Sequence, residues 1–131
     1  MTLAACILGC SGLTLTTEER AFFRDLKPWG FILFRRNIDS PGQVRALTDA
    51  LREVAGRDDT PILIDQEGGR VARLQPPHWR RYPPGRAYGS LAGNDPLYRR
   101  EVTRLGARLM AHDLRELGIN VDCVPAKLVS L

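Results

Sequence analysis

Two acidic residues and two arginines follow a short apolar run in the middle of the chain. Residues 62–64 are apolar, and Asp65, Glu67, Arg70 and Arg73 come after them, with a pair of glycines at positions 68 and 69. Such a run is typical of a parallel strand covered on both faces, which ends at an open rim. Carboxylates and guanidinium groups at a rim can hydrogen-bond a hydroxyl-rich or charged small molecule. The alternative is a solvated turn with local ion pairs.

The composition fits an ordinary globular domain. The chain has 131 residues, of which 44% are hydrophobic and 26% charged, and its formal net charge is +4. This length fits one domain. The densest basic stretch, residues 70–86, holds five arginines but also four prolines, which indicate an extended loop. A nucleic-acid site would show a basic stripe with stacking aromatics, so we expect no nucleic-acid partner. A solvated rim or a site for an anionic small ligand is expected instead.

Neither a membrane nor a metal is expected as a partner. The longest apolar runs fall far short of the ~20 residues of a spanning helix. The N-terminus has no basic region and does not resemble a signal peptide. The three cysteines are Cys6, Cys10 and Cys123, an odd number that favours reduced thiols and a cytoplasmic location. They lack the second ligand pair of a zinc site, and no cofactor is indicated.

Strand and helix patterns alternate along the chain. Apolar runs at residues 3–8, 30–34, 61–65 and 119–123 predict strands. Thr16 or Thr17 can cap a helix that ends near Leu26, and Ser40 with Pro41 can begin a second helix that ends at Gly56. A third helix is predicted from residue 95 to Gly118, with apolar residues on or near one face: Val102, Leu105, Leu109, Leu114 and Leu117. Residues 66–94 are predicted to form a long loop, a kind that is often functional.

Two α/β architectures fit this alternation, which predicts parallel strands. One is a doubly wound sheet, and the other is the first half of a (β/α)8 TIM barrel with about four βα units. A dinucleotide site is weakly supported, because the turn at residues 9–12 lacks the third glycine of that motif. A complete barrel needs about 250 residues. In both architectures ligands bind at the carboxyl ends of the strands, where Asp65, Arg35 and Asn37 are expected.

The motifs at residues 30–37 and 62–73 resemble the N-terminal half of glycoside hydrolase family 3. The first reads Gly-Phe-Ile-Leu-Phe-Arg-Arg-Asn, and the second contains Asp-Gln-Glu-Gly-Gly-Arg-Val. The chain is most similar to the bacterial cytoplasmic β-N-acetylhexosaminidases of peptidoglycan recycling, from about residue 8 to residue 125. Residues 118–125 resemble the next strand of that family. The resemblance implies a (β/α)8 barrel, of which this chain would form the first half. It also implies removal of a terminal N-acetylglucosamine from muropeptide fragments by a retaining mechanism.

The resemblance implies a substrate-binding role for Asp65 and Arg73. An ion pair of Arg73 with Asp65 or Glu67 is the structural alternative. No catalytic residue is expected in this chain, because the resemblance places the nucleophilic aspartate and the histidine acid/base further downstream. Asp65 and Glu67 are therefore not interpreted as an acid and nucleophile pair, and neither His78 nor His112 matches the family's histidine. The glycines at 68 and 69 are expected to be conformational, and Arg70 to order the turn.

The resemblance ends at residue 125. Residues 1–125 are expected to form the N-terminal part of the barrel domain, and residues 126–131 an atypical tail left by truncation, frameshift or a chosen end point. Half a barrel leaves sheet edges open, so aggregation or dependence on a partner half is expected. Three functions compete: part of a monomeric β-N-acetylhexosaminidase that is inactive alone, a non-catalytic sugar-binding remnant, and an unrelated α/β nucleotide-binding domain.

Overall fold

The computed structural model describes residues 2–91 and 95–124. Its main sheet contains four parallel strands in the order β1-β2-β3-β6, and a separate antiparallel hairpin pairs β4 with β5. The strands are β1 (Ala4–Leu8), β2 (Pro28–Leu33), β3 (Ile62–Ile64), β4 (Gln66–Gly68), β5 (Val71–Ala72) and β6 (Val121–Asp122). The helices are α1 (Thr17–Leu26), the 3-10 turn η1 (Arg35–Asn37), α2 (Pro41–Ala55), α3 (Gly85–Gly89) and α4 (Pro96–Arg115).

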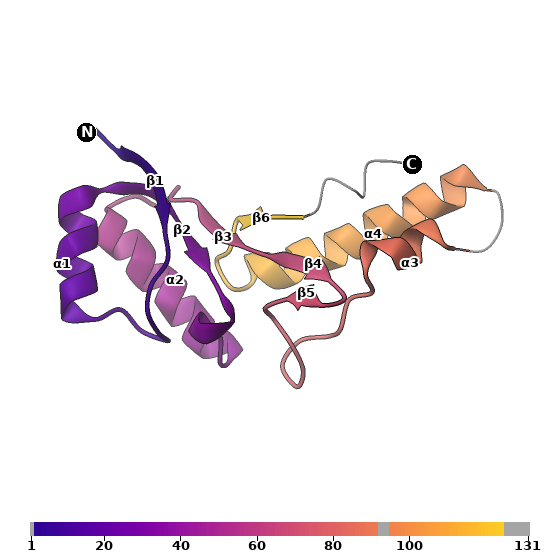
Figure 1. Cartoon of the computed structure of the whole chain (residues 1–131), viewed down its shortest axis with the longest axis horizontal. Coiled ribbons are helices and arrows are strands. Elements are labelled where there is room, and N and C mark those ends of the chain that lie inside the picture. Colours follow the sequence, from indigo (N-terminus) through magenta and orange to yellow (C-terminus); the bar gives the residue numbers. More distant parts are fainter. Residues whose placement is uncertain (1, 92–94, 125–131) are drawn as a thin grey trace.

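The strand order decides between the two predicted architectures. Each strand of the main sheet pairs with the next one along the chain, apart from the hairpin inserted after β3. A doubly wound sheet reverses its order at a switch point, whereas a barrel adds its strands in sequence. The α/β barrel prediction is therefore confirmed for the described part of the chain, which supplies four parallel strands (Figure 1).

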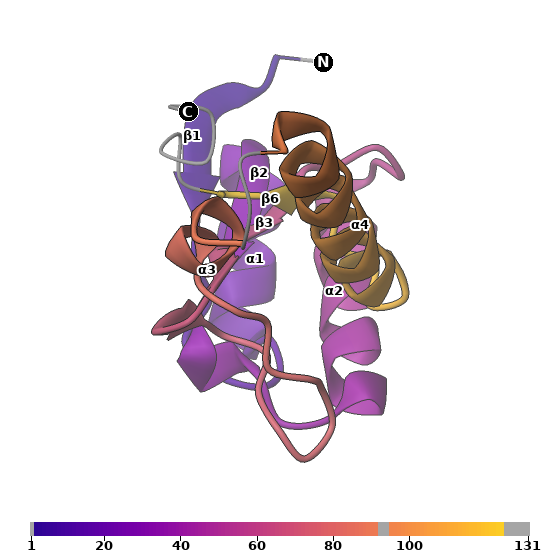
Figure 2. The same ribbon diagram turned by 90° about the vertical axis from the view of Figure 1, so that its right-hand side faces the viewer.

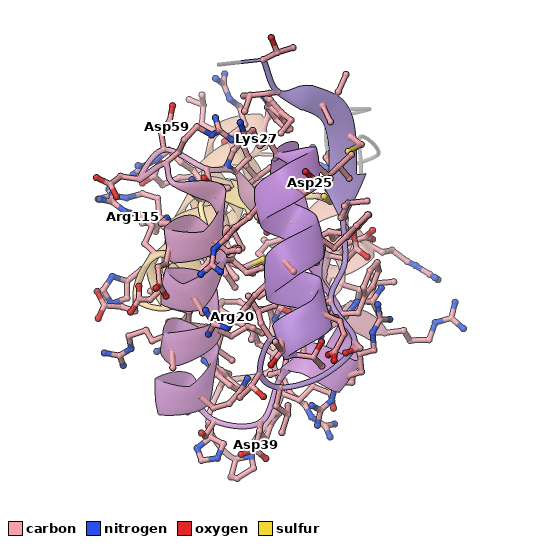
Figure 3. All side chains as sticks on the ribbon, turned by 90° about the vertical axis from the view of Figure 1, so that its left-hand side faces the viewer. Arg20, Asp25, Lys27, Asp39, Asp59 and Arg115 are labelled. Carbon is pink, nitrogen blue, oxygen red and sulfur yellow. The ribbon has the colours of Figure 1, made fainter. Side chains whose placement is uncertain are left out.

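Helices α1 and α2 are formed by strong local signals and cover the sheet together. Thr16 caps α1 in a capping box with Glu19, and Ser40 caps α2 with Pro41 in its first turn. Figure 3 shows the two helices side by side. Arg20 of α1 reaches Glu53 of α2 at 3.5 Å. The buried face of α2 is the one that its apolar spacing predicts: Val44, Leu47, Leu51 and Val54.

Residues 66–94 contain more structure than a long loop. Within the part of this segment that the structure describes, β4 and β5 form a hairpin and residues 85–89 form α3. Both views show α3 beside α4 (Figures 1 and 2). Tyr88 of α3 lies against Gly106 of α4, where a Cβ would collide with the tyrosine ring. The prediction that this whole segment is a loop was therefore wrong. A short hairpin and a short helix satisfy part of its backbone hydrogen-bonding groups.

Helix α4 is buried only toward its C-terminal end. Met110 and Leu114 are buried in it, and Leu117 just beyond it is buried too. Leu105 and Leu109 remain 46% and 47% exposed, although they share the predicted apolar face. In Figure 1 the N-terminal part of α4 lies away from the sheet, beside α3. The predicted tail at residues 126–131 lies outside the described residues.

Candidate functional site

The carboxyl ends of β3 and β6 bring acidic side chains together. Ile64 of β3 pairs in parallel register with Asp122 of β6, and Asp65 follows Ile64 directly. Cys123 donates its backbone N–H to the carbonyl of Ile64 at 2.9 Å, which continues the ladder past both strand ends. Ligand sites of α/β barrels lie at this edge of the sheet. The sequence prediction placed Asp65 here, and the fold adds Asp122.

Asp65 and Arg73 form an ion pair. The Oδ2 atom of Asp65 accepts a hydrogen bond from Nη2 of Arg73 at 2.8 Å, and the two side chains are 25% and 28% exposed. The structural alternative for Arg73 is therefore present, specifically with Asp65. An ion pair that keeps one side open to solvent is also a pre-oriented donor and acceptor set, because each partner holds the other's rotamer. The Nε atom of Arg73 is buried and has no acceptor among the described residues.

The side chain of Gln66 bonds the backbone next to this pair. Its side chain is 1% exposed, and its Oε1 accepts backbone N–H groups of Arg73 at 2.8 Å and Leu74 at 3.0 Å. Its Nε2 donates to the carbonyl of Leu74 at 3.2 Å. All of these bonds span from β4 to the segment that carries Arg73. The amide of Gln66 therefore fixes the backbone from which Arg73 reaches Asp65. Sequence reasoning missed this role, because a glutamine beside two acids gives no sign of being buried.

Asp122 is the second residue that sequence reasoning missed as part of the site. Its Oδ1 accepts the backbone N–H of Gln66 at 3.0 Å. Burial raises the pKa of this carboxyl to about 6, opposed by that hydrogen bond and reinforced by the charges of Asp65 and Glu67. Burial, with the same acidic neighbours, also raises the pKa of the Cys123 thiol. The rim therefore holds a carboxyl that titrates near neutral pH beside the Asp65–Arg73 pair. Its signal in the sequence was its place in a predicted strand end.

The two glycines of the motif are conformational, as predicted. Gly68 and Gly69 have φ angles of +86° and +61°, in the left-handed region that favours glycine. They also lie tightly under the following proline segment. A Cβ on Gly68 would come within 2.3 Å of the Pro83 carbonyl oxygen, and one on Gly69 within 2.8 Å of Pro84 Cβ. The hairpin turn and residues 82–84 are therefore packed directly on one another.

Other predicted residues take no part in this cluster of contacts. His78 and His112 are exposed, the first beside Trp79 and the second on α4. Arg70 is exposed, and no hydrogen bond from its side chain is found within residues 2–91 and 95–124, so the expectation that it orders the turn is not supported. Glu67 is half-buried and contributes charge beside Asp122.

The ends of β1 and β2 are joined by a structural amide. Asn37 is fully buried, and its Nδ2 donates to the carbonyls of Cys10 at 3.1 Å and Gly12 at 2.8 Å. In the turn at residues 9–12, the backbone N–H of Ser11 donates to the Glu19 carboxylate at 2.7 Å. A phosphate would need such N–H groups, and here a carboxylate of α1 already uses one. Arg35 uses its guanidinium on the carbonyl of Ile38 at 2.8 Å.

No cluster of three or more metal-ligating side chains occurs in residues 2–91 and 95–124. Among the helices within those ranges, none is long and apolar enough to cross a membrane.

The fold and this rim define part of an α/β barrel with a cluster of polar side chains at the carboxyl ends of its strands. Curated relatives agree. The β-hexosaminidase of Alkalilimnicola ehrlichii is 36% identical over 125 residues, which cover 95% of this chain and 35% of that protein. The β-hexosaminidase of Methylobacillus flagellatus is 36% identical over 127 residues, with the same coverage of both. The chain thus spans about a third of the length of these relatives. No family model matches it.

Solved structures lead to the same group. NagZ of Neisseria gonorrhoeae, in complex with N-trifluoroacetyl-D-glucosamine, superposes with a TM-score of 0.85 at 27% identity, covering 94% of this chain and 35% of that one. A glycoside hydrolase family 3 β-N-acetylglucosaminidase of Paenibacillus sp. superposes with a TM-score of 0.75 at 32% identity, covering 88% and 21%. The resemblance to the N-terminal part of glycoside hydrolase family 3 is confirmed: the chain is homologous to β-hexosaminidases of this group.

Proposed function

We propose that this chain forms the first part of a β-N-acetylhexosaminidase and contributes Asp65 and Arg73 to the binding of a terminal N-acetylglucosamine. The observation that carries the proposal is the 2.8 Å ion pair of Asp65 and Arg73 at the carboxyl ends of the parallel strands. A carboxylate accepts hydrogen bonds from sugar hydroxyls, and a guanidinium donates in a planar fork. Both groups are half-buried and already oriented, so little side-chain entropy is lost when a sugar binds.

The whole protein's reaction is part of the same proposal. The substrate is a muropeptide fragment of peptidoglycan recycling, the location is cytoplasmic, and the parent enzyme is a monomer that uses neither a metal nor an organic cofactor. Hydrolysis with retention requires two groups, a nucleophile and an acid/base. Both lie outside this chain, so residues 1–131 bind the sugar without cleaving it. The rim carboxyls Asp65 and Asp122 are committed to Arg73 and to the Gln66 backbone, which fits a binding role.

Titration with N-acetylglucosamine tests the binding role. Amide NMR spectra of the wild type, Asp65→Asn and Arg73→Gln are followed as the sugar is added. Each variant is expected to weaken binding about tenfold or more, since charge-assisted hydrogen bonds are lost. Asp59→Asn is the matched control, because Asp59 is 84% exposed in a turn and its ion pair with Arg57 is long, at 3.6 Å. Unchanged affinity in both site variants, or no saturable binding by the wild type, would contradict the proposal.

Hydrolysis of 4-nitrophenyl N-acetyl-β-glucosaminide tests whether this chain binds the sugar without cleaving it. The pure 131-residue chain is expected to release no nitrophenol above the rate in buffer, because it lacks the nucleophile of the covalent step. Turnover that survives repurification and is abolished by Asp122→Asn would overturn this part, since it would place a working carboxyl within the described rim. Thermal melts of each variant separate loss of the site from loss of the fold.

A further inference from the structure

A pocket of about 290 Å³ lies between the hairpin and the proline-rich segment that follows it. Its lining includes Ala72 and Leu74, which alternate along the chain with Arg73. Arg73 itself is not among the lining residues, and its guanidinium group contacts Asp65, which does not line the pocket either. The pocket is therefore separate from the proposed sugar site, and its function does not depend on that proposal.

Two arginines from different segments meet at this pocket. Arg70 comes from the hairpin turn and Arg81 from the proline-rich segment, and Gln75 adds an amide between them. None of the residues that line the pocket is acidic. Across the described ranges, neither Arg70 nor Arg81 lies within ion-pair distance of a carboxylate. Two guanidinium groups that face one pocket repel each other, and a bound anion removes that repulsion.

Tyr82, which lines the pocket, and Arg80, the neighbour of Arg81, both contact one acid outside the pocket. Asp113 of α4 accepts the hydroxyl hydrogen of Tyr82 at 2.7 Å and pairs with Arg80 at 3.9 Å. Burial and this hydrogen bond raise the pKa of the Tyr82 hydroxyl well above its usual range, so Tyr82 stays neutral. Arg80 thus has a carboxylate partner, whereas Arg81 has none within 4.0 Å among residues 2–91 and 95–124.

The backbone under the two arginines is fixed. The N–H of Gly69 donates to the carbonyl of Tyr82 at 2.9 Å, which ties the hairpin turn to the segment that carries Arg81. Trp79 packs against the main core, and Tyr82 is buried. A pocket whose walls are already positioned loses little entropy on binding, and that favours a specific site over a diffuse basic surface.

We propose that this pocket binds a small oxyanion, the phosphate or carboxylate group of a metabolite or substrate appendage, through Arg70 and Arg81. Guanidinium groups bind both kinds of oxyanion with paired, charge-assisted hydrogen bonds. Gln75 supplies a neutral donor beside them. Of the four lining residues that remain, Gly69, Ala72 and Leu74 carry no polar side-chain group, and the Tyr82 hydroxyl already donates to Asp113. Two of the arginines that give the chain its net positive charge would thus share one binding site.

Phosphate and acetate titrations test the site and separate its two possible ligand sources. Amide NMR spectra are recorded as either anion is added at constant ionic strength, so that general screening does not change. The expected result is saturable shifts at Gly69, Arg70 and Gln75. Tighter binding of phosphate identifies phosphate esters as the ligand class, and equal or tighter binding of acetate identifies carboxylates.

Charge-removing variants decide whether the arginines carry the binding. Arg70→Gln and Arg81→Gln are each expected to raise the dissociation constant about tenfold. Arg81→Lys keeps the positive charge and is expected to raise it less. Arg100→Gln on α4 is the matched control: it removes the same charge from an exposed position and is expected to change binding less than twofold. Equal losses in all variants, or no saturable shifts in the wild type, would overturn the proposal. N-acetylglucosamine binding is unaffected by either result, so the two proposals fail separately.

Discussion

The region before Asp65 and the region after it are stabilised in different ways. Helix α2 has 15 residues and buries six of them, whereas α4 has 20 and buries two. The first region is a dense apolar layer of α1, α2 and three strands. The second is held by a few buried polar bonds, by glycines under prolines, and by the C-terminal end of α4. The difference teaches that apolar spacing along a helix marks a face suited to burial, while the neighbouring elements decide how much of it is covered.

The largest expected effect sharpens this contrast with one substitution at two sites. Leu51→Ala in α2 removes a side chain that is 0% exposed in the core. We expect it to lower the free energy of unfolding by about 2–5 kcal/mol. Leu109→Ala in α4, at a position that is 47% exposed, is expected to cost less than about 1 kcal/mol. Urea denaturation followed by circular dichroism measures both.

A similar cost at both leucines would break the comparison. It would mean that the exposed face of α4 is covered in solution, for instance by self-association. Sedimentation at the same protein concentration distinguishes that case, because an associated wild type would dissociate in the Leu109→Ala variant.

The second prediction addresses the polar bonds of the later region. Gln66→Leu keeps the volume and burial of the side chain but leaves the N–H groups of Arg73 and Leu74 without an acceptor. Two unsatisfied buried donors are expected to cost about 2–4 kcal/mol. The control is Gln75→Leu, whose side chain is exposed and makes one bond, to the carbonyl of Ala72 at 3.0 Å. We expect a change within about 0.5 kcal/mol there. If the two variants unfold alike, the hairpin is not held by Gln66.

The third prediction concerns the glycines. Gly68→Ala places a Cβ near the Pro83 carbonyl at a positive φ of 86°, and is expected to cost about 1–3 kcal/mol. Gly42→Ala, in the first turn of α2, has no heavy atom within 4 Å of the added Cβ. It is expected to raise stability by about 0.5–1 kcal/mol, because alanine is the better helix former. Thermal melts of the two variants should therefore shift in opposite directions. If both melting temperatures shift in the same direction, the close packing of the hairpin on the proline segment does not contribute to stability.

Much of the first region could be predicted from the sequence because its signals are local. Thr16 and Ser40 cap their helices as expected, and the apolar spacing of α2 identifies its buried face. The site was predictable at Asp65 and Arg73, through a strand end and a motif. β2 begins at Pro28, two residues before the predicted start, since a proline can open a strand without losing a ladder bond that it needs.

The later region was harder to predict because its determinants are not local. β4 and β5 have only three and two residues, and β4 includes a glycine, so no alternating pattern marks them. The role of Asp122 depends on a hydrogen bond to the Gln66 backbone, 56 positions earlier in the chain. Exposure of Leu105 depends on which elements lie beside α4, and its own spacing cannot report that. Long-range contacts of this kind appear only once the chain is folded.

The smallest expected effect is a pH dependence confined to the rim. The pKa of Asp122 rises from 3.8 to about 6 on folding, so between these values the native state binds more protons than the unfolded state. The contribution of Asp122 to stability therefore falls as the pH rises from about 4 to about 6 and is level above that range.

Asp122→Asn keeps an acceptor for the Gln66 N–H but removes the charge. Relative to the wild type, the variant should gain about 1–2 kcal/mol at pH 7 and nothing near pH 4, since solvent screens part of the interaction. Urea unfolding at several pH values measures the difference, with Asp59→Asn as the exposed control. If the stability difference between variant and wild type is the same at every pH, Asp122 has the same pKa in the folded and unfolded states, and the prediction is wrong.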